Sequence, residues 1–513
     1  MPKSFLISTY YALKNNLLRI AGMLGIISFI ALFSIKLIII TANIPDISGS
    51  ESSTIHPIQR VVAGLPLYTN PENPPFLITQ YTPLYFYIVG TTYRMCNFDP
   101  SNVHRIYTFS RVFSLGFLML AIGVIFLTLQ QILLARKDLS ILVCLLVFHI
   151  LSYWTMFSSR PDSLSFFLFT LFIFCVAKAF QVESRKNFYL NISILIAVVA
   201  FFCKQSGMIY PMIMGSYFLY FKEWKILIRL VLIGIFTFTT LALTLSLFDP
   251  VALFQNIIGG VVNSIHIRGW YGFTLKPLVL PFATFLTGGL AIGFKWIVFQ
   301  KMNIKSFLGW AVIMLFIFDM LIALKDGSNV GYLGDFIYLS LLIIALYFSE
   351  YKTLEVTKRV LIAGISICTF AHCSVWVGMD YLTTDIERYT SLLTADQRIS
   401  QYILENQKIK PNKYVYLGNF TRNYSMWYLR NFLFRHNIVA YEELNLVTYK
   451  NKVFNFNKFN DAIKSGALQF VIVEKGIAPD NLFKTPFERK NMNFRFKKTM
   501  DYVDIYENIK KAD

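Results

Sequence analysis

The sequence predicts a polytopic α-helical membrane protein with a large first outer loop and a small C-terminal α/β domain. Hydrophobic residues make up 55% of the 513-residue chain and charged residues only 15%, a balance that excludes an ordinary water-soluble fold. Many apolar segments reach or approach the roughly 20 residues that a helix needs to cross a bilayer. From residue 380 the composition becomes polar and mixed. We therefore expect a transmembrane domain over residues 1–379 and a second domain over residues 380–513.

The net charge of +19 would suggest a nucleic-acid partner in a soluble protein. Here we expect no nucleic acid, because Lys and Arg gather in the cytoplasmic loops of membrane proteins. The six cysteines are scattered without a Cys-x-x-Cys pair, so neither a disulfide framework nor a thiolate metal site is indicated. Nucleotide-binding and serine-hydrolase motifs are also missing from the sequence.

The first span is predicted at residues 20–42, and basic residues before it place the N-terminus in the cytoplasm. Lys36 lies near the outer end of this span, where it either snorkels to the interface or faces a site. Residues 81–95 are too short to span the bilayer and are expected to form a helix on the outer face. The second span, at residues 111–134, then runs from outside to inside.

We expect eleven spans in all, because basic residues gather consistently in alternate turns. They lie at residues 20–42, 111–134, 139–157, 163–179, 188–203, 207–221, 226–248, 275–294, 306–324, 330–348 and 359–379. A chain of eleven spans that starts inside finishes outside, so the C-terminal domain is expected to be extracytoplasmic. The richness in Ile, Phe, Lys and Asn is typical of an AT-rich bacterial genome and favours a bacterial inner membrane.

The C-terminal domain is expected to alternate strands and helices, which indicates a small α/β fold. The predicted strands are residues 413–417, 438–441, 468–473 and 502–506, and the predicted helices are residues 394–407 and 457–465. Its surplus of Lys and Arg either faces anionic lipid headgroups or forms a solvated basic surface.

The first outer loop, residues 43–110, is the leading candidate for an active site. It is far longer than the usual connection, and long loops of this kind are commonly functional. It contains two isolated carboxylates, Asp46 and Glu51. A third carboxylate, Asp162, lies at the outer end of the fourth span. Carboxylates at an apolar boundary can act as general bases or, together, hold a divalent metal ion that bridges a phosphate.

Four cations at the outer ends of later spans suit a phosphate: Arg160, Lys204, Arg268 and Lys325. Arg binds phosphate with a bidentate fork and Lys as a point charge. Carboxylates and cations at the bilayer surface fit a lipid-phosphate substrate whose tail stays in the membrane. Simpler interpretations also stand at this point. Arg160 and Asp162 suit the start of a helix, Lys204 suits an interface anchor, and Asp46 suits a plain loop residue.

In their order and spacing over residues 20–350, several motifs resemble the GT-C superfamily of membrane glycosyltransferases. The nearest resemblance is to the bacterial branch related to dolichyl-phosphate-mannose protein mannosyltransferases and lipid A aminoarabinose transferases. The motifs are Glu51 followed 13 residues on by Gly64 in AGLPLY, then QYTPLYFYIVG at 80–90, RVFSL at 111–115, SRPDSL at 159–164, FCKQSG at 202–207 and KDGSNVGY at 325–332.

The resemblance implies an inverting transferase that moves a sugar from a polyprenyl-phosphate donor to a lipid, glycan or protein acceptor on the outer face. Glu51 then fits the base, with Asp46 second, and Asp162 fits the second acidic motif. The chain has Ser50-Glu51 where an Asp-Glu pair is commonest, which leaves the identity of the base open. If Glu51 is the base, Glu51→Gln should nearly abolish transfer and leave folding unchanged.

Other classes of protein remain as alternatives. A transporter or flippase often shows internal repeats and broken helices near the midplane, whereas this sequence has no evident repeat and its polar groups lie at the outer boundary. A polysaccharide polymerase or ligase would use a diphosphate-linked glycan instead. A non-enzymatic scaffold would have no use for costly carboxylates at the membrane boundary.

Overall fold

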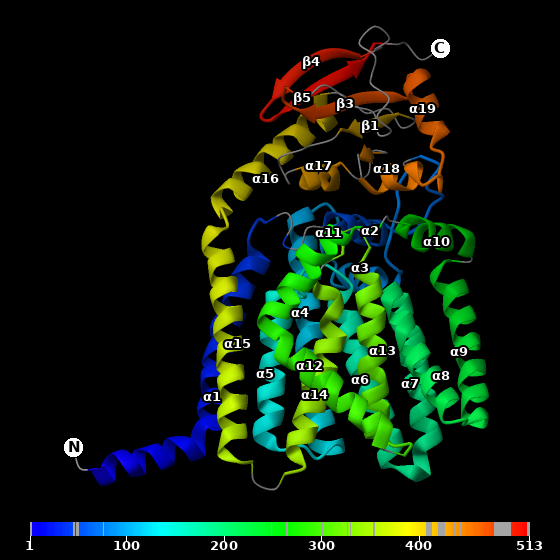
Figure 1. The fold of residues 1–513 in the computed structure, drawn as a ribbon. Coiled ribbons are helices and arrows are strands. Elements are labelled where there is room, and N and C mark those ends of the chain that lie inside the picture. The colour runs from blue at the N-terminus through cyan, green and yellow to red at the C-terminus, as the bar shows by residue number, and fades with distance from the viewer. Residues whose placement is uncertain are drawn as a thin grey trace.

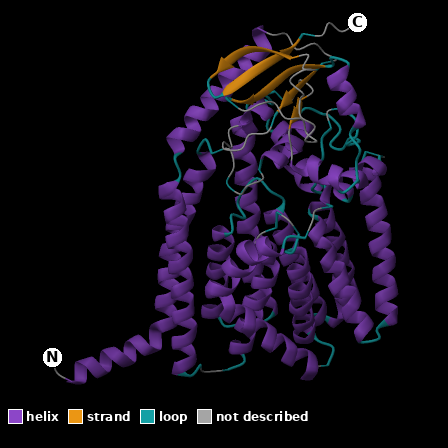
Figure 2. Ribbon diagram, turned by 45° about the horizontal axis from the view of Figure 1, so that its top comes forward, coloured by secondary structure: helices purple, strands orange, loops and turns teal. Residues whose placement is uncertain are grey.

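The protein forms a helical bundle with a small sheet stacked on one end, which we call the sheet end (Figure 1). The computed structural model describes residues 3–44, 47, 51–74, 76–247, 249–262, 265–299, 301–325, 327–328, 330–351, 354–406, 413–418, 426–433, 438–440, 443–476 and 494–509. Turning the molecule shows the same two layers, with all strands at the sheet end and helices below (Figure 2).

The bundle is built from long helices, most of which are joined by short turns. Its helices are α1 (Lys3–Thr41), α4 (Val103–Leu127), α5 (Lys137–Tyr153), α6 (Asp162–Gln181), α7 (Lys186–Cys203), α8 (Ile209–Tyr220), α9 (Trp224–Leu245), α12 (Lys276–Phe299), α13 (Ile304–Ile322), α14 (Gly334–Ser349) and α15 (Val356–Thr383). Each of the eleven predicted spans thus coincides with one helix of the bundle.

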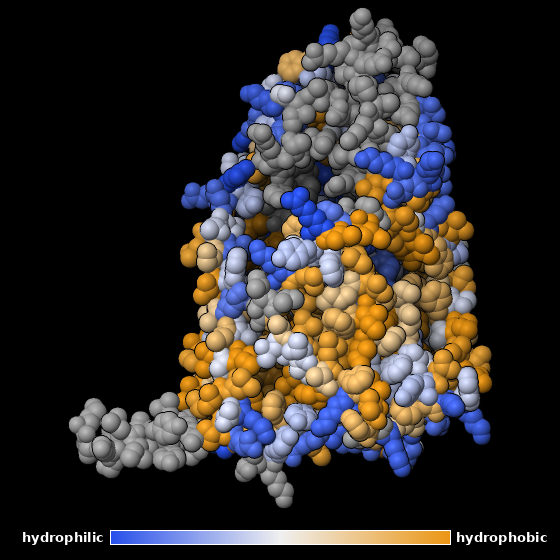
Figure 3. Space-filling view, viewed as in Figure 1, coloured by the Kyte–Doolittle hydropathy of each residue, from blue (hydrophilic) through white to orange (hydrophobic). Residues whose placement is uncertain are grey.

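Nine helical segments within the described residues are long and apolar enough to cross a membrane. The two remaining predicted spans correspond to α5, with 17 residues, and α8, with 12. Apolar side chains such as Ile235 and Phe236 of α9 are exposed, which is costly in water but not in lipid. Figure 3 shows hydrophobic residues over the side of the bundle and hydrophilic ones toward its ends. The chain is therefore an integral membrane protein, while the count of eleven and the sidedness stay predictions.

Short helices cover the sheet end of the bundle. They are α2 (Ser52–Val62), α3 (Leu84–Met95), α10 (Pro250–Ile257), η4 (Gly259–Val261), α11 (Ile267–Gly269) and η6 (Val330–Leu333). The helix predicted at residues 81–95 is α3. It packs closely on α2 at Gly90, where a Cβ atom would lie 2.7 Å from Cγ1 of Val61.

Lys36 does not snorkel to the interface. Its side chain is buried, with 2% of its surface exposed, and its ammonium lies 4.2 Å from the centre of the Phe157 ring. The stem therefore points into the protein near the sheet end of α1.

The C-terminal part forms a five-stranded mixed sheet in the order β2-β1-β3-β5-β4. The strands are β1 (Tyr414–Leu417), β2 (Ile438–Ala440), β3 (Leu468–Glu474), β4 (Phe494–Met500) and β5 (Val503–Asn508). β1 is parallel to β2 and β3, and β5 is antiparallel to β3 and β4. Helices α16 (Ile386–Gln401), η7 (Tyr402–Asn406), α17 (Met426–Phe432), α18 (Glu443–Lys450) and α19 (Asn457–Lys464) accompany it. The predicted α/β character is confirmed, and β4 is a strand that the sequence did not predict.

Candidate functional site

Two of the predicted phosphate-binding cations, Arg160 and Lys204, pair with Asp162 at the sheet end. Asp162 is the first residue of α6 and follows Pro161. The Lys204 ammonium lies 2.8 Å from Asp162 Oδ1, and Arg160 Nε lies 3.1 Å from Oδ2. The side chains of Arg160, Asp162 and Lys204 keep 12%, 11% and 7% of their surface exposed. Burial lowers the pKa of Lys204, but the Asp162 charge more than offsets this and raises it above its ordinary value.

Two tyrosines form the walls of this charged group. The Tyr81 hydroxyl accepts a hydrogen bond from Arg160 Nη2 at 3.2 Å. The Lys204 ammonium lies 4.1 Å from the centre of the Tyr332 ring, a cation–π contact. Tyr81 belongs to the QYTPLYFYIVG motif and Tyr332 to the KDGSNVGY motif, so motifs far apart in sequence meet here.

Lys325 adds a further positive charge to the group. Its side chain is half-buried, and it has no hydrogen-bond or ion-pair partner among the described residues. Burial, and secondarily the charge of Lys204, lowers the pKa of its ammonium to about 8. We call Arg160, Asp162, Lys204 and Lys325 the cation cluster. Arg160 and Lys204 share the Asp162 carboxylate, and Lys325 adds a charge near Lys204, so the four described residues of the cluster carry an excess of positive charge, which favours an anion.

Arg268, the fourth predicted cation, follows a segment that pairs with the backbone at Lys325, but its side chain does not join the cation cluster. Ile265 forms an isolated antiparallel bridge with Lys325, and the His266 N–H donates to Leu324 O at 2.9 Å. This pairing brings the segment before α11 to the backbone of Lys325. The Arg268 side chain itself is exposed and forms no ion pair within the described residues.

The Glu51 carboxylate accepts four hydrogen bonds from the protein. Its Oε1 accepts from Arg111 Nε at 3.1 Å and from Ser159 N at 2.6 Å. Its Oε2 accepts from Arg111 Nη2 at 2.6 Å and from Ile47 N at 2.8 Å. Both side chains of the ion pair are fully buried. Burial raises the pKa of Glu51, but the Arg111 charge and these bonds outweigh it and lower the pKa below its ordinary value.

Four donors fill the four lone-pair positions of a carboxylate, so Glu51 offers no acceptor site to a substrate proton in this conformation. Its base role stays a prediction that the geometry does not favour. Asp46, the second predicted base, lies outside the described residues. The sequence neighbour of Asp46, Ile47, donates its N–H to Glu51, so Glu51 fixes the backbone beside the alternative base.

Glu51 also fixes the start of the SRPDSL motif. Besides the Ser159 N–H bond to Glu51, the Thr54 hydroxyl donates to Ser159 O, and the Ser110 hydroxyl donates to Ser159 Oγ at 2.6 Å. These buried contacts from α2 and α4 hold the residue that precedes Arg160. The two halves of the predicted site, the first loop and the cations, are therefore joined through Ser159.

The described residues do not fit a divalent metal ion. Among them, no group of three or more His, Cys, Asp or Glu side chains could hold one. The two predicted carboxylates that are described, Glu51 and Asp162, are each neutralised by cationic side chains. A divalent cation would have to displace these partners.

Sequence reasoning missed several polar residues near the cluster. The Tyr210 hydroxyl donates to Asp335 Oδ2 at 2.6 Å, and Asp319 is buried on the neighbouring helix α13. Arg111 begins the RVFSL motif, but its pairing with Glu51 was not predicted. The sequence could have indicated Tyr332, because it lies in the KDGSNVGY motif. Asp335, three residues later, lies outside that motif and could not be recognised.

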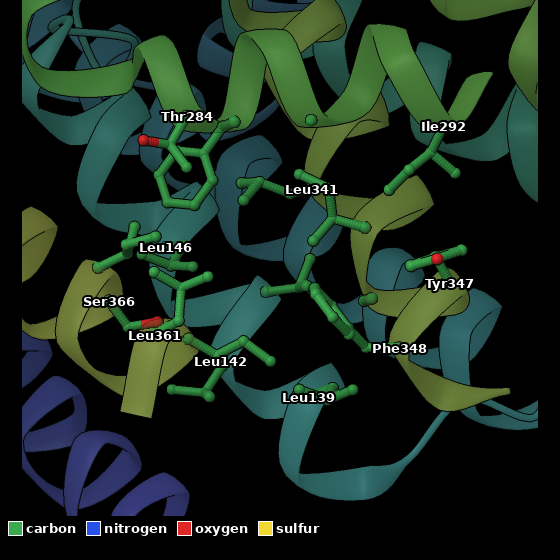
Figure 4. A pocket seen from close by; sticks show the side chains of 17 residues that line it. Leu139, Leu142, Leu146, Thr284, Ile292, Leu341, Tyr347, Phe348, Leu361 and Ser366 are labelled. Atoms are coloured by element: carbon green, nitrogen blue, oxygen red, sulfur yellow. The ribbon is translucent and has the colours of Figure 1, made fainter. Parts of the chain in front are cut away.

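A separate cavity of about 190 Å³ lies deeper in the bundle, between α5, α12, α14 and α15. Side chains such as Leu142, Leu146, Leu341 and Leu361 point into it from these helices (Figure 4). No charged residue lines it. It is an apolar space at membrane level and is not the polar site.

Comparison with solved structures identifies the class of fold. ArnT from Cupriavidus metallidurans in the apo state matches with a TM-score of 0.63 at 10% identity, over 94% of this chain and 97% of that chain. The same protein bound to undecaprenyl phosphate matches with a TM-score of 0.61 at 9% identity, with the same coverage. The apo oligosaccharyltransferase of Archaeoglobus fulgidus matches with a TM-score of 0.57 at 12% identity, over 90% of this chain and 69% of that chain.

No protein-family model and no curated protein matches the sequence. The structural matches therefore concern the fold. The chain has the fold of the GT-C membrane glycosyltransferases, which confirms the resemblance that its motifs predicted.

Proposed function

We propose that this protein is a membrane glycosyltransferase that takes a sugar from a polyprenyl-phosphate donor. The observation that carries the proposal is the cation cluster at the end of a membrane bundle, where Arg160 and Lys204 pair with Asp162 and Lys325 adds a positive charge near Lys204. A lipid phosphate presents its charge at this level while its tail stays in the bilayer. The fold supports the same class, since a protein of this fold binds undecaprenyl phosphate.

In the proposed reaction the acceptor is a hydroxyl group of a lipid, glycan or protein. A carboxylate takes its proton, the oxygen attacks the anomeric carbon, and the bond from that carbon to the phosphate oxygen breaks. The polyprenyl phosphate leaves with the bonding electrons, and the configuration inverts. The cations stabilise the charge that develops on the leaving phosphate, and such preorganised stabilisation supplies a few kcal/mol per contact.

For the base we propose Asp46 rather than Glu51. The sequence ranked Glu51 first, but a base needs a free lone pair within reach of the substrate proton, and four donors already occupy the Glu51 carboxylate. Asp162 is held by Arg160 and Lys204, so we assign it to positioning the cations. We further propose that the cluster faces the outer side of a bacterial inner membrane, as the positive-inside pattern predicts.

The test uses the full chain in lipid nanodiscs and measures binding of undecaprenyl phosphate, with undecaprenol as the uncharged comparison. We expect the phosphate to bind and undecaprenol to bind much more weakly. Lys325→Gln should weaken phosphate binding by about 10- to 150-fold, the equivalent of one charge-assisted hydrogen bond. Lys325 suits this test because it has no partner among the described residues whose loss would unfold the protein.

The matched control is Lys358→Gln, at the opposite end of the bundle, where Lys358 lies 3.6 Å from Glu355. It should leave the affinity unchanged. Equal binding of undecaprenol and undecaprenyl phosphate would refute the phosphate site. Acceptor-dependent release of undecaprenyl phosphate from a sugar-loaded donor then separates a transferase from a transporter, and lipid and glycan profiling of a deletion strain identifies the sugar.

A further inference from the structure

A short segment of the first loop, residues 76–81, connects the C-terminal sheet to the cation cluster. We call it the strap. It begins at Phe76, which is buried in the core of the C-terminal part. The Phe76 ring packs at 5.5 Å on Phe459 and at 6.4 Å on Phe456, measured between ring centres. A first-loop residue thus forms part of the C-terminal core.

Phe76 is held there against its backbone preference. Its φ angle is +61°, in the left-handed region that an aromatic residue rarely adopts. Such a conformation is strained and persists only when its surroundings enforce it. Here the enforcement comes from the ring contacts and from the Asn445 amide, which donates to Phe76 O at 2.9 Å.

The middle of the strap is held from the membrane side by α10 and η4. The Thr79 N–H donates to Asn256 Oδ1 at 2.8 Å, and the Gln80 amide donates to Gly260 O at 3.2 Å. Ile78 lies so close to Gly260 that a Cβ atom there would be 2.5 Å from Ile78 Cγ2. The strap therefore fits a narrow space between the sheet and the bundle.

The far end of the strap reaches the cation cluster at two points. The Gln205 side chain, next to Lys204 in sequence, donates to Gln80 O. The Tyr81 hydroxyl accepts from Arg160. Tyr81 is itself fixed by the Tyr68 hydroxyl, which donates to Tyr81 O at 2.8 Å. The strap thus contacts Arg160 directly and Lys204 through its sequence neighbour Gln205.

We propose that the C-terminal domain positions the phosphate-binding cluster through the strap, with Phe76 as the positioning residue. Phe76 touches no reacting atom. It sets the strap so that the Tyr81 hydroxyl orients Arg160 and the Gln80 carbonyl holds the side chain of Gln205, the residue after Lys204. The inference rests on the proposed function, because it takes the cluster to bind a phosphate ester.

The experiment measures undecaprenyl-phosphate affinity of the full chain in nanodiscs for Phe76→Ala, Tyr81→Phe and the double variant. Tyr81→Phe removes one hydrogen bond, which corresponds to about a 2- to 12-fold loss. Phe76→Ala should lose at least as much. If Phe76 acts through Tyr81, the double variant binds about as weakly as the weaker single variant, whereas independent effects would multiply.

The matched control is Phe470→Ala. Phe470 is also fully buried in the C-terminal part, but it belongs to the separate core cluster that contains Leu429 and Ile505. It should destabilise the domain to a similar degree and leave the affinity within about 2-fold, because an Ala cavity acts locally. An equal loss of affinity in Phe470→Ala would show that only the integrity of the domain matters and would overturn the inference.

Two further variants keep the inference testable if Phe76→Ala does not fold. Phe76→Leu keeps an apolar side chain and should restore most of the affinity. Gly260→Ala pushes on Ile78 from the opposite side and should weaken binding as Phe76→Ala does. If the wild type binds but all strap variants bind equally well, the inference alone is overturned. If the wild type binds no undecaprenyl phosphate, the proposed function is overturned and the inference with it.

Discussion

Glu51 and Asp46 lie five residues apart in the sequence, and we predict different roles for them. Glu51 is buried against Arg111 with four donors on its carboxylate. Removing one partner of a buried ion pair leaves an uncompensated charge and costs about 3–5 kcal/mol. We therefore expect Glu51→Gln to lower the thermal unfolding temperature markedly. The expectation from sequence, that this change leaves folding intact, is revised by the ion pair.

The matched variant is Asp46→Asn. It should abolish sugar transfer while leaving the unfolding temperature close to that of the wild type. Both variants are compared by fluorescence-monitored unfolding in detergent and by release of undecaprenyl phosphate. If Glu51→Gln unfolds at the wild-type temperature and has lost transfer, the base role returns to Glu51.

Lys325 should make phosphate binding depend on pH. Its pKa is lowered to about 8 by burial, with the Lys204 charge as the second cause. The ammonium is charged below this pH and neutral above it, so affinity for a phosphate should fall as the pH rises through about 8. A titration of undecaprenyl-phosphate binding from about pH 7 to pH 10 measures this. Lys325→Gln should flatten the curve; an unchanged slope would exclude Lys325 as its source.

At the residue scale, the sequence singled out charged residues that the structure brings together, but it did not predict how they pair. Arg160, Asp162, Lys204 and Lys325 were found because charged residues at span ends are costly and therefore few. The partner of each charge depends on how the helices pack, which no local pattern encodes. For this reason the bond between Arg111 and Glu51, 60 residues apart, was not predicted.

At the element scale, the helices followed from their apolar runs, whereas one strand did not. β4 has the sequence FRFKKTM with only its first residue buried. Its exposed basic residues lack the alternation of apolar and polar side chains by which strands are recognised. It forms because β5 offers it a hydrogen-bonding edge, and that edge is a tertiary feature.

The contact of α2 with α3 at Gly90 gives a prediction at this scale. In Gly90→Ala the new methyl group would lie 2.7 Å from Val61, and overpacking of this kind costs about 1–3 kcal/mol. Thermal unfolding in detergent should show the loss. Gly123→Ala is the control, because a Cβ atom on Gly123 of α4 meets nothing within 4 Å. It should be neutral or stabilising, and equal losses in both would contradict a packing effect.

For the whole molecule, hydropathy predicted the architecture well, because membrane-spanning helices must be long and apolar. All eleven predicted spans match helices, although α5 and α8 are not among the nine described helical segments that are long and apolar enough to cross a membrane. The sequence did not predict that the C-terminal sheet stacks on the candidate site. It depends on contacts such as the one between Phe76 and Phe459, which join residues nearly four hundred positions apart.

The sidedness of the molecule can be tested with a native cysteine. Cys96 is exposed at the end of α3, at the sheet end, whereas the other exposed cysteine, Cys368, lies within the spanning helix α15. If the sheet end faces outward, a membrane-impermeant maleimide should label Cys96 in intact spheroplasts. Cys96→Ser should abolish the labelling. Labelling that requires permeabilised cells would place the sheet end in the cytoplasm.

The excess of positive charge in the cation cluster also has a consequence for handling the protein. Among the described residues, Arg160 and Lys325 each repel Lys204, while Asp162 pairs with Arg160 and Lys204. The ligand-free form should therefore be less stable than a form that has bound an anion. A ligand that binds only the folded state adds about 2.7 kcal/mol of stability at one hundred times its dissociation constant. Extraction in detergent strips such lipids away, and purification with added undecaprenyl phosphate should preserve the protein. If the proposed function holds, a melting-temperature screen over lipid-linked sugars should identify the donor as the compound that stabilises the protein most.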